Sequence, residues 1–232
     1  MAQPIFIFCF LSLVLFVNGD PFDFFQLVQQ WGPSTCNNTR GTQCYAQPQP
    51  LFTIHGLWPS NYSNARLACQ SNEQFLESKV TALLSDLNTY WPDVIGGDNS
   101  RFWTYEWNKH GACAKPPFTV YQYFNIALEL RKHKDYDLLA ILNAAGLSPE
   151  ISKNLVSQDI LSPIGKKTGK KPGIHCNNNG KTGKLQLFEI VLCFDKNGAN
   201  LLDCPPFVSS SCKSKFLWLL PQQSSVGVTD YP

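Results

Sequence analysis

An even set of cysteines limits what this chain can fold into more than any other feature. Nine cysteines occur among the 232 residues. Cys9 lies in an N-terminal segment that we expect to be removed, and the other eight are Cys36, Cys44, Cys69, Cys113, Cys176, Cys193, Cys204 and Cys212. In an exported chain such a set predicts a disulfide framework, which could connect in about 105 ways. The sequence itself favours two short clips, Cys36 with Cys44 and Cys193 with Cys204, because each pair brackets a turn-rich loop.

The expectation of export comes from the N-terminus. Residues 1–19 contain the apolar run PIFIFCFLSLVLFV, which is too short to cross a bilayer comfortably. Val17 and Gly19 are small residues where a signal peptidase would cut. We therefore expect a signal peptide over 1–19 and one mature domain over 20–232. The mature protein is expected to be secreted, extracellular, without a membrane partner, and monomeric.

Two glycosylation sequons and a small net positive charge are also compatible with an exported protein. Asn37 stands in Asn-Asn-Thr and Asn61 in Asn-Tyr-Ser, both in turn-rich segments from which a glycan could project. The formal net charge of +2 is small. It is compatible with a polyanionic substrate, but it is weaker than the excess typical of duplex-binding proteins.

A zinc site is the alternative use of the cysteines. The sequence has no CxxC pair, and its cysteines are scattered rather than grouped at the spacings of structural zinc sites. We therefore expect no metal.

Hydrophobic periodicity predicts an α+β fold. Segments 22–31 and 51–58 are strand candidates, the second stopped by Pro59, and the long apolar run over 185–194 predicts a central strand. Because helices in the middle of the chain separate strands at both ends, we expect a central antiparallel sheet flanked by several helices in a single disulfide-bonded domain.

Three helices are predicted between these strands. One covers 73–89, with Ser71 and Gln74 as its capping box, and another begins at Thr119 with Gln122 as the partner in a second box. A short helix over 137–145 is expected to end at Gly146. The Lys-rich segment over 164–173 is interpreted as a solvated surface loop.

Two separated motifs hold most of the polar chemistry. His55 stands in FTIHGLWP, in the strand predicted over 51–58, and RFWTYEWNKHGAC at 101–113 holds Glu106, Lys109 and His110. If that segment is helical, Glu106 and His110 lie at i and i+4, with Lys109 at i+3 from the glutamate. All three then project from one side. If they are buried, each charge needs a partner.

Three interpretations of this pattern compete. Glu106 and His110 could be an ordinary helical pair, which stabilises a helix by a few tenths of a kcal/mol. They could be half of a metal site, although no HExxH motif accompanies them and Lys109 would repel a cation. In the third, His55 joins them: two histidines act as general acid and general base, each worth roughly 10²- to 10⁴-fold in rate, while Lys109 and Glu106 stabilise the developing charge. That set suits phosphodiester cleavage without a metal, and RNA supplies its own 2′-hydroxyl nucleophile.

The two motifs closely resemble the active-site segments of the ribonuclease T2 family. The resemblance extends to VQQWGPSTC at 28–36, to WPDV at 91–94 and to the pattern of eight cysteines. It covers essentially the whole mature chain. It implies a secreted endoribonuclease that cleaves single-stranded RNA to 2′,3′-cyclic phosphates and uses no cofactor.

The resemblance also implies a role for each residue of the two motifs. His110 matches the general base that takes the proton of the 2′-hydroxyl, and His55 matches the general acid that protonates the leaving 5′-oxygen. Glu106 and Lys109 match the pair that stabilises the pentacovalent phosphorane. The same residues then hydrolyse the cyclic phosphate slowly, with water in place of the alcohol.

Substrate-binding residues and a cysteine pairing follow from the same resemblance. Trp58 is expected to support the His55 strand, and Phe102 is the expected stacking platform for a base. The other expected substrate-binding residues are Gln30, Asp93, Ile95 and Tyr105. The family's pairing joins Cys36 to Cys44, Cys69 to Cys113, Cys176 to Cys212 and Cys193 to Cys204.

Tyr105 departs from the family pattern. Many members have a third histidine at this position, immediately before the glutamate, where it is assigned to phosphate binding. A phenol can donate a hydrogen bond to phosphate but carries no positive charge, so weaker substrate binding is expected. The substitution resembles the plant S-ribonucleases of gametophytic self-incompatibility, as do the slightly basic balance and the sequon after IHGLWP. The C-terminal SCKSKFLWLLP instead resembles the S-like enzymes.

These features leave two biological roles for an active enzyme. The first is the pistil determinant of self-incompatibility, with a pollen-side recognition protein as partner and the polar loop over 64–71 as part of the recognised surface. The second is an S-like ribonuclease for phosphate scavenging, senescence or defence. A storage or defence protein without activity is disfavoured, because all the catalytic positions are intact.

Overall fold

The computed structural model describes residues 22–38, 44–45, 48–63, 67, 69, 73–114, 117–150, 153–209 and 212–220. The predicted signal peptide over 1–19 and most of the predicted recognition loop, with Ser71, lie outside these residues. In the part that is described, no helix is both long and apolar enough to cross a membrane.

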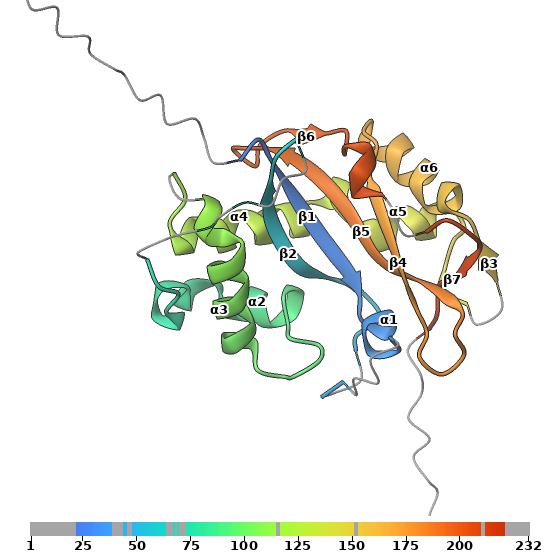
Figure 1. Ribbon diagram of the computed structural model, residues 1–232, viewed down its shortest axis with the longest axis horizontal. Helices are drawn as coiled ribbons and strands as arrows, with labels where there is room; N and C mark the ends of the chain where they lie inside the picture. Colours follow the sequence, from blue (N-terminus) through green and yellow to red (C-terminus); the bar gives the residue numbers. More distant parts are fainter. Residues whose placement is uncertain are drawn as a thin grey trace, which may run out of the picture.

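One sheet runs through the middle of the molecule (Figure 1). Its strands, within the described residues, are β1 Phe24–Trp31, β2 Phe52–Ser60, β3 Asn154–Leu155, β4 Gly173–Asn178, β5 Leu185–Asp195, β6 Leu201–Leu202 and β7 Phe216–Leu217. The strand order is β2-β1-β5-β7-β3, and β4 and β6 also pair with β5. All of these pairings are antiparallel except that of β7 with β5. The predicted central strand is therefore confirmed as β5, and the predicted first strand as β1.

Helices pack against the sheet near β2 and, on the other side of the molecule, near β4 (Figure 1). The α-helices are α1 Gly32–Cys36, α2 Leu84–Tyr90, α3 Asn99–Lys109, α4 Val120–Lys132, α5 Leu138–Ala144 and α6 Ser157–Thr168. Turns of 3₁₀ helix lie at Glu77–Lys79, Thr81–Leu83, Gly111–Ala114, Lys134–Tyr136 and Pro206–Val208. Figure 1 shows α2 and α3 beside β2, and α5 and α6 on the side of β4. This arrangement confirms the predicted α+β fold in a single domain.

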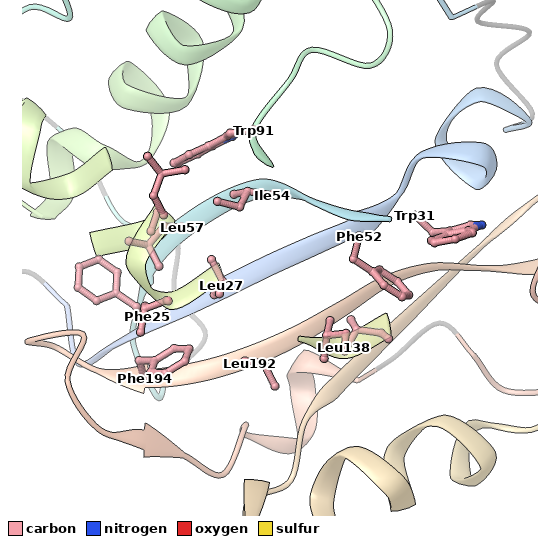
Figure 2. Packing of buried hydrophobic residues seen from close by; sticks show 14 of the residues in the cluster. Phe25, Leu27, Trp31, Phe52, Ile54, Leu57, Trp91, Leu138, Leu192 and Phe194 are labelled. Atoms are coloured by element: carbon pink, nitrogen blue, oxygen red, sulfur yellow. The ribbon is translucent and has the colours of Figure 1, made fainter. Parts of the chain in front are cut away.

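The main core lies between the sheet and the helices. Figure 2 shows apolar side chains of β1, β2 and β5 packed together with Trp91 and Leu138. Four apolar residues of α4 are buried in this core: Val120, Phe124, Ala127 and Leu128. Its N-terminus forms the predicted capping box between Thr119 and Gln122. The helix predicted over 137–145 is likewise confirmed as α5, capped by Asp137 and followed by Gly146 at a φ of +75°.

β2 runs through a proline that we expected to end it. Pro59 pairs with Phe25 of β1 inside the strand. The N–H of Asp23 donates to the carbonyl of Ser60 at 2.8 Å, so Ser60 faces β1 and Pro59 points its nitrogen outward. β2 forms an edge of the sheet, where a residue without an N–H is tolerated. The predicted stop at Pro59 is therefore wrong.

The helix predicted over 73–89 is wrong in its first half. Residues 73–83 are extended and then form two 3₁₀ turns, and α2 begins only at Leu84. The indole N–H of Trp107 donates to the carbonyl of Glu73 at 2.7 Å, which takes up an acceptor that a helix would use internally. Leu76, which the periodicity puts on the buried face, is 51% exposed. A tertiary contact thus prevails over the local pattern.

The Lys-rich segment over 164–173 is not a loop throughout, so that prediction is also wrong in part. Residues 164–168 of this segment form the C-terminal end of α6. Pro163 lies inside the same helix, just before them. Gly169 follows at a φ of +71° and ends the helix, as glycine commonly does in the left-handed region.

Four disulfides join the described cysteines in the pairing that the family resemblance implies. They are Cys36–Cys44, Cys69–Cys113, Cys176–Cys212 and Cys193–Cys204. Of these, Cys69–Cys113 closes the longest loop, with a sequence separation of 44. It also anchors the second polar motif, because Cys113 is the last residue of that motif and its N–H donates to the carbonyl of His110 at 3.0 Å.

We predict that replacing Cys69 and Cys113 together by serine lowers the free energy of unfolding by about 4 kcal/mol, since closing so long a loop removes much entropy from the unfolded chain. The matched control replaces Cys193 and Cys204, whose separation is 11, for which about 3 kcal/mol is expected. Equilibrium unfolding in urea measures both. A larger loss from the shorter clip would contradict the loop-entropy account.

Candidate active site

A β-bulge in β2 sets the position of His55. Val28 of β1 pairs with Gly56, but the next residue, Gln29, pairs with Ile54, so His55 is an extra residue without an opposite partner. Ile54 and Leu57 then both face the main core, although regular alternation would put residues three apart on opposite faces. Bulges commonly re-aim a side chain in this way beside functional sites.

Side chains from the neighbouring helices hold the outer edge of β2. The indole N–H of Trp91 donates to the carbonyl of His55 at 3.1 Å, and the hydroxyl of Tyr123 donates to that of Leu57 at 2.6 Å. Arg131 Nε donates to the carbonyl of Phe52 at 2.8 Å. All three donors belong to buried residues, so the strand that carries His55 is fixed along its length.

The C-terminal turn of α3 contributes the second group of residues. Asp98 caps the start of the helix by accepting the N–H of Arg101. At the other end Glu106 is only 1% exposed, whereas Lys109 lies on the surface. His110 is the C-cap residue, and its N–H donates to the carbonyl of Glu106 at 2.9 Å. The segment is therefore helical up to Lys109, which meets the condition under which the three residues were placed on one side.

Trp58 lies among these residues and contacts three of them. Its indole N–H donates to Glu106 Oε2 at 3.0 Å. Its ring stacks on that of His110, with centroids 5.0 Å apart, and meets the ring of His55 edge-on at 5.2 Å. The family resemblance implied that Trp58 supports the His55 strand and binds substrate, and the structure places it in contact with both histidines and the carboxylate.

Gly56 leaves the space in which this contact forms. A Cβ added at Gly56 would collide with the indole nitrogen of Trp58 and with Glu106 Oε2. A side chain at this position would force the tryptophan or the carboxylate to move.

Burial and neighbouring charges push the pKa values of the two histidines apart. Burial lowers the pKa of His55, but the hydrogen bond and charge of Glu189, with the charge of Glu106, outweigh it, so that pKa lies above its usual 6.5. Burial, with the positive charges of Lys109 and His55, lowers the pKa of His110 to about 3. Burial also raises the pKa of Glu106. One imidazole thus holds a proton over a pH range in which the other is neutral.

One ring nitrogen of His110, Nε2, is buried without a hydrogen-bond partner among the described residues. A neutral imidazole with a vacant ring nitrogen can act as a base, provided that the other nitrogen carries the hydrogen.

Glu189 is a member of the site that sequence reasoning missed. Its Oε1 atom lies 2.5 Å from Nδ1 of His55. Glu189 is the one charged residue of the apolar run LQLFEIVLCF over 185–194, and a lone carboxylate in a buried strand is a signal that could have revealed it. His175 of β4 contacts the same carboxylate, with its Nδ1 atom 2.9 Å from Glu189 Oε2.

Of the expected substrate-binding residues besides the tryptophan, all in the described part of the chain, Phe102 is the one with a ring contact to His55. The ring of Phe102 is nearly parallel to that of His55, with centroids 6.4 Å apart. Gln30 is buried and accepts a hydrogen bond from Thr35 Oγ1 at 3.0 Å. Tyr105 is 52% exposed, with Lys109 Nζ 5.0 Å from its ring centroid.

Asp93 and Ile95 belong to the loop before α3. The carboxylate of Asp93 accepts the backbone N–H groups of Ile95, Gly96 and Asp98, so it shapes the turn. Asp93 also lines a hollow of about 510 Å³ with Thr53 and Asn99. Ile95 is exposed on the same loop.

The two predicted glycosylation positions lie outside this cluster. Asn37 is the residue that follows α1, and Asn61 follows β2, and both are partly exposed. Within the described residues, no group of three or more histidine, cysteine or acidic side chains is placed to hold a metal ion.

Comparison with known proteins gives a consistent set of matches. The model of the ribonuclease T2 family matches residues 22–204. Extracellular ribonuclease LE of Solanum lycopersicum is 37% identical over 199 residues, which are 82% of this chain and 84% of that protein. Ribonuclease S-6 of Pyrus pyrifolia is 33% identical over 204 residues, 86% of this chain and 87% of that protein. The solved structure of ribonuclease MC1 from bitter gourd seeds superposes with a TM-score of 0.76 at 34% identity, covering 84% of this chain and all of the other.

Proposed function

Because the chain belongs to the ribonuclease T2 family and is a ribonuclease, we propose that it cleaves single-stranded RNA by metal-independent transesterification to 2′,3′-cyclic phosphates. The observation that carries this proposal is the contact of Trp58 with the rings of His55 and His110 and with the carboxylate of Glu106. It gathers from two distant segments the groups that such a reaction needs.

In the proposed mechanism, His110 acts as the general base. Its vacant Nε2 atom takes the proton of the 2′-hydroxyl, and the 2′-oxygen then attacks phosphorus. The bond from phosphorus to the 5′-oxygen breaks, and His55 gives its proton to that oxygen. The separation of the two pKa values supports this division of roles, because the base must be neutral and the acid protonated.

Lys109 and Glu106 are proposed to stabilise the phosphorane. The ammonium group of Lys109 offsets the negative charge that develops on the phosphoryl oxygens. The carboxyl of Glu106, whose pKa is raised by burial, is held by the indole of Trp58. In a slower second step water replaces the alcohol, so that His55 takes a proton from water and His110 returns one to the 2′-oxygen.

An RNA digestion in the presence of EDTA tests the reaction class. We expect cleavage to continue and the new 3′ ends to carry 2′,3′-cyclic phosphates, identified by mass spectrometry of the fragments. Free 3′-hydroxyl ends, or cleavage that stops when the chelator is added, would overturn the proposal.

The pH dependence of cleavage should follow the two histidines. Activity is expected to rise as the pH increases through about 3, where His110 loses its proton. It should fall as the pH increases through the pKa of His55, which is raised above 6.5. The rate constant kcat/KM for a diribonucleotide, measured from pH 3 to pH 9, reports these groups in the free enzyme. A rate that keeps rising above pH 8 would contradict the assignment of His55 as the acid.

For base binding, we propose Phe102 as the stacking platform. Its nearly parallel alignment with the ring of His55 supports this, because a base stacked on Phe102 lies beside the reacting phosphate. Gln30, Asp93, Ile95 and Tyr105 are proposed as further contacts to the substrate.

For the biological role, we propose a secreted pistil determinant of gametophytic self-incompatibility, recognised by a pollen-side protein. Tyr105 in place of the family's third histidine and the sequon at Asn61 support this role. The leader-like segment and four disulfides support secretion. The alternative is an S-like ribonuclease for phosphate scavenging, senescence or defence, which the identity to extracellular ribonuclease LE favours.

Expression separates the two roles. For a pistil determinant we expect transcript in the style and strong divergence between the alleles of different individuals. Transcript in roots or phosphate-starved leaves, with near-identical alleles, would instead establish the S-like role.

A further inference from the structure

Glu189 connects two histidines that lie on different strands. It pairs with His175 across the β4–β5 ladder, and it also reaches His55 on β2. Its side chain is only 5% exposed, against 30% for His55 and 23% for His175. A carboxylate buried this deeply is costly unless it is paired and hydrogen-bonded, and each of its oxygens lies within hydrogen-bond distance of one imidazole.

The surroundings of His175 determine where its protons lie. Its Nε2 atom lies 2.5 Å from the carbonyl oxygen of Val208, which can only accept, so Nε2 carries a hydrogen. Its Nδ1 atom faces a carboxylate oxygen of Glu189, which also accepts when ionised. His175 is therefore an imidazolium ion paired with Glu189. The direction of its pKa agrees: burial lowers it, but the hydrogen bond and charge of Glu189 raise it further.

The same reasoning orients His55. With Glu189 ionised, Nδ1 of His55 must donate to Oε1. The remaining ring nitrogen, Nε2, is then the atom that can exchange a proton with a substrate. A neutral imidazole left after proton transfer would keep its hydrogen on Nδ1, ready to be recharged at Nε2.

We propose that Glu189 and His175 form a positioning pair for His55: the carboxylate fixes the ring with Nε2 toward the leaving oxygen, and the imidazolium holds the carboxylate in place. This inference rests on the proposed role of His55 as the general acid. Neither residue touches the reacting atoms, so both act through His55.

Other charged groups also face His55, and their influence on its pKa must be distinguished from that of Glu189 and His175. From α3 these are Glu106, Lys109 and His110, of which Glu106 raises the pKa of His55 and Lys109 lowers it. From the sheet they are Glu189, which raises that pKa, and His175, whose positive charge opposes that of His55. Changes at Glu189 and at His175 should consequently move the acid in opposite directions.

The first experiment uses Glu189→Gln and His175→Asn. Glutamine keeps the shape of the side chain and removes the charge, and we expect kcat to fall at least about tenfold, the loss seen when the carboxylate partner of a metal-binding histidine is removed. Activity should fall at high pH as His55 loses its proton. In Glu189→Gln this descending limb of the pH profile should move to lower pH by about one unit. Asparagine keeps a donor near the position of Nδ1 but removes the charge, so this limb should move to higher pH.

The chain offers a matched control for each change. Glu129→Gln and His133→Asn make the same chemical substitutions on exposed residues of α4 and its C-cap, and both should leave the profile unchanged. If Glu189→Gln and His175→Asn lower kcat without moving the limb, the pair supports only the structure and the proposal is overturned.

A second measurement does not depend on the variants folding or on RNA. In the wild-type protein labelled with ¹⁵N-histidine, we expect neutral His55 to be the Nδ1–H tautomer and His175 to carry both ring protons at pH 6.5. An Nε2–H tautomer at His55, or a neutral His175 at that pH, would overturn the proposal. Failure of the proposed function would instead appear as wild-type protein that does not cleave RNA while these spectra remain as expected.

Discussion

Cleavage of RNA is expected to fall on the order of 10⁴-fold in both His55→Ala and His110→Ala, because in the proposed mechanism each histidine transfers a proton in the step that breaks the phosphodiester. The two variants should differ when the leaving group is changed. In uridine 3′-(4-nitrophenyl phosphate) the leaving nitrophenolate is stable without a proton, so a general acid is hardly needed. His55→Ala should regain most of its activity on this substrate, whereas His110→Ala should not.

The control for this pair is His133→Ala. His133 is exposed at the C-terminal end of α4, and its loss should leave both rates unchanged. Rescue of His110→Ala, with none for His55→Ala, would reverse the acid and base assignments. Persistent cleavage of RNA by His110→Ala would remove that residue from the mechanism.

The second large effect is expected from a single methyl group. Gly56→Ala should lower kcat about a hundredfold, since the new Cβ displaces the indole of Trp58 or the carboxylate of Glu106, and a misplacement of about 1 Å at a catalytic group costs roughly that much. Steady-state kinetics on a diribonucleotide measure the change. KM should change less than kcat, because the displaced groups act mainly in the transition state.

Gly165→Ala is the matched control. Gly165 lies in α6, and its nearest atom to an added Cβ is the carbonyl oxygen of Lys170 at 3.4 Å, an ordinary contact. Alanine there should leave kcat unchanged and stabilise the helix by about 1 kcal/mol. Full activity in Gly56→Ala would show that Trp58 and Glu106 need not occupy their observed positions.

Local patterns predicted part of what presents the site. The strand that carries His55 was predicted, whereas the helix of Glu106 and His110 entered only as a condition for placing both residues on one side. The capping box of Thr119 and Gln122 likewise marked the start of α4. These signals are local, because each depends on residues a few positions apart.

What could not be predicted depends on contacts between distant segments. The bulge at His55 arises from the register between β1 and β2, and its one local signal in FTIHGLWP is Gly56, because an isolated glycine inside a strand suggests a bulge or a close approach. Glu189 reaches His55 over a sequence separation of 134. The wrong first half of the helix predicted over 73–89 has the same cause, because the backbone carbonyl of Glu73 accepts from Trp107 of another element.

The edge position of β2 has a consequence for self-association. An exposed sheet edge is a template on which a second copy of a chain can add a strand. Here the carbonyls of Phe52, His55 and Leu57 are already occupied by donors from the helices, and Pro59 offers no N–H outward. The strand that carries His55 can therefore remain at the border of the sheet, where a long polymer could reach it, without becoming a site of aggregation.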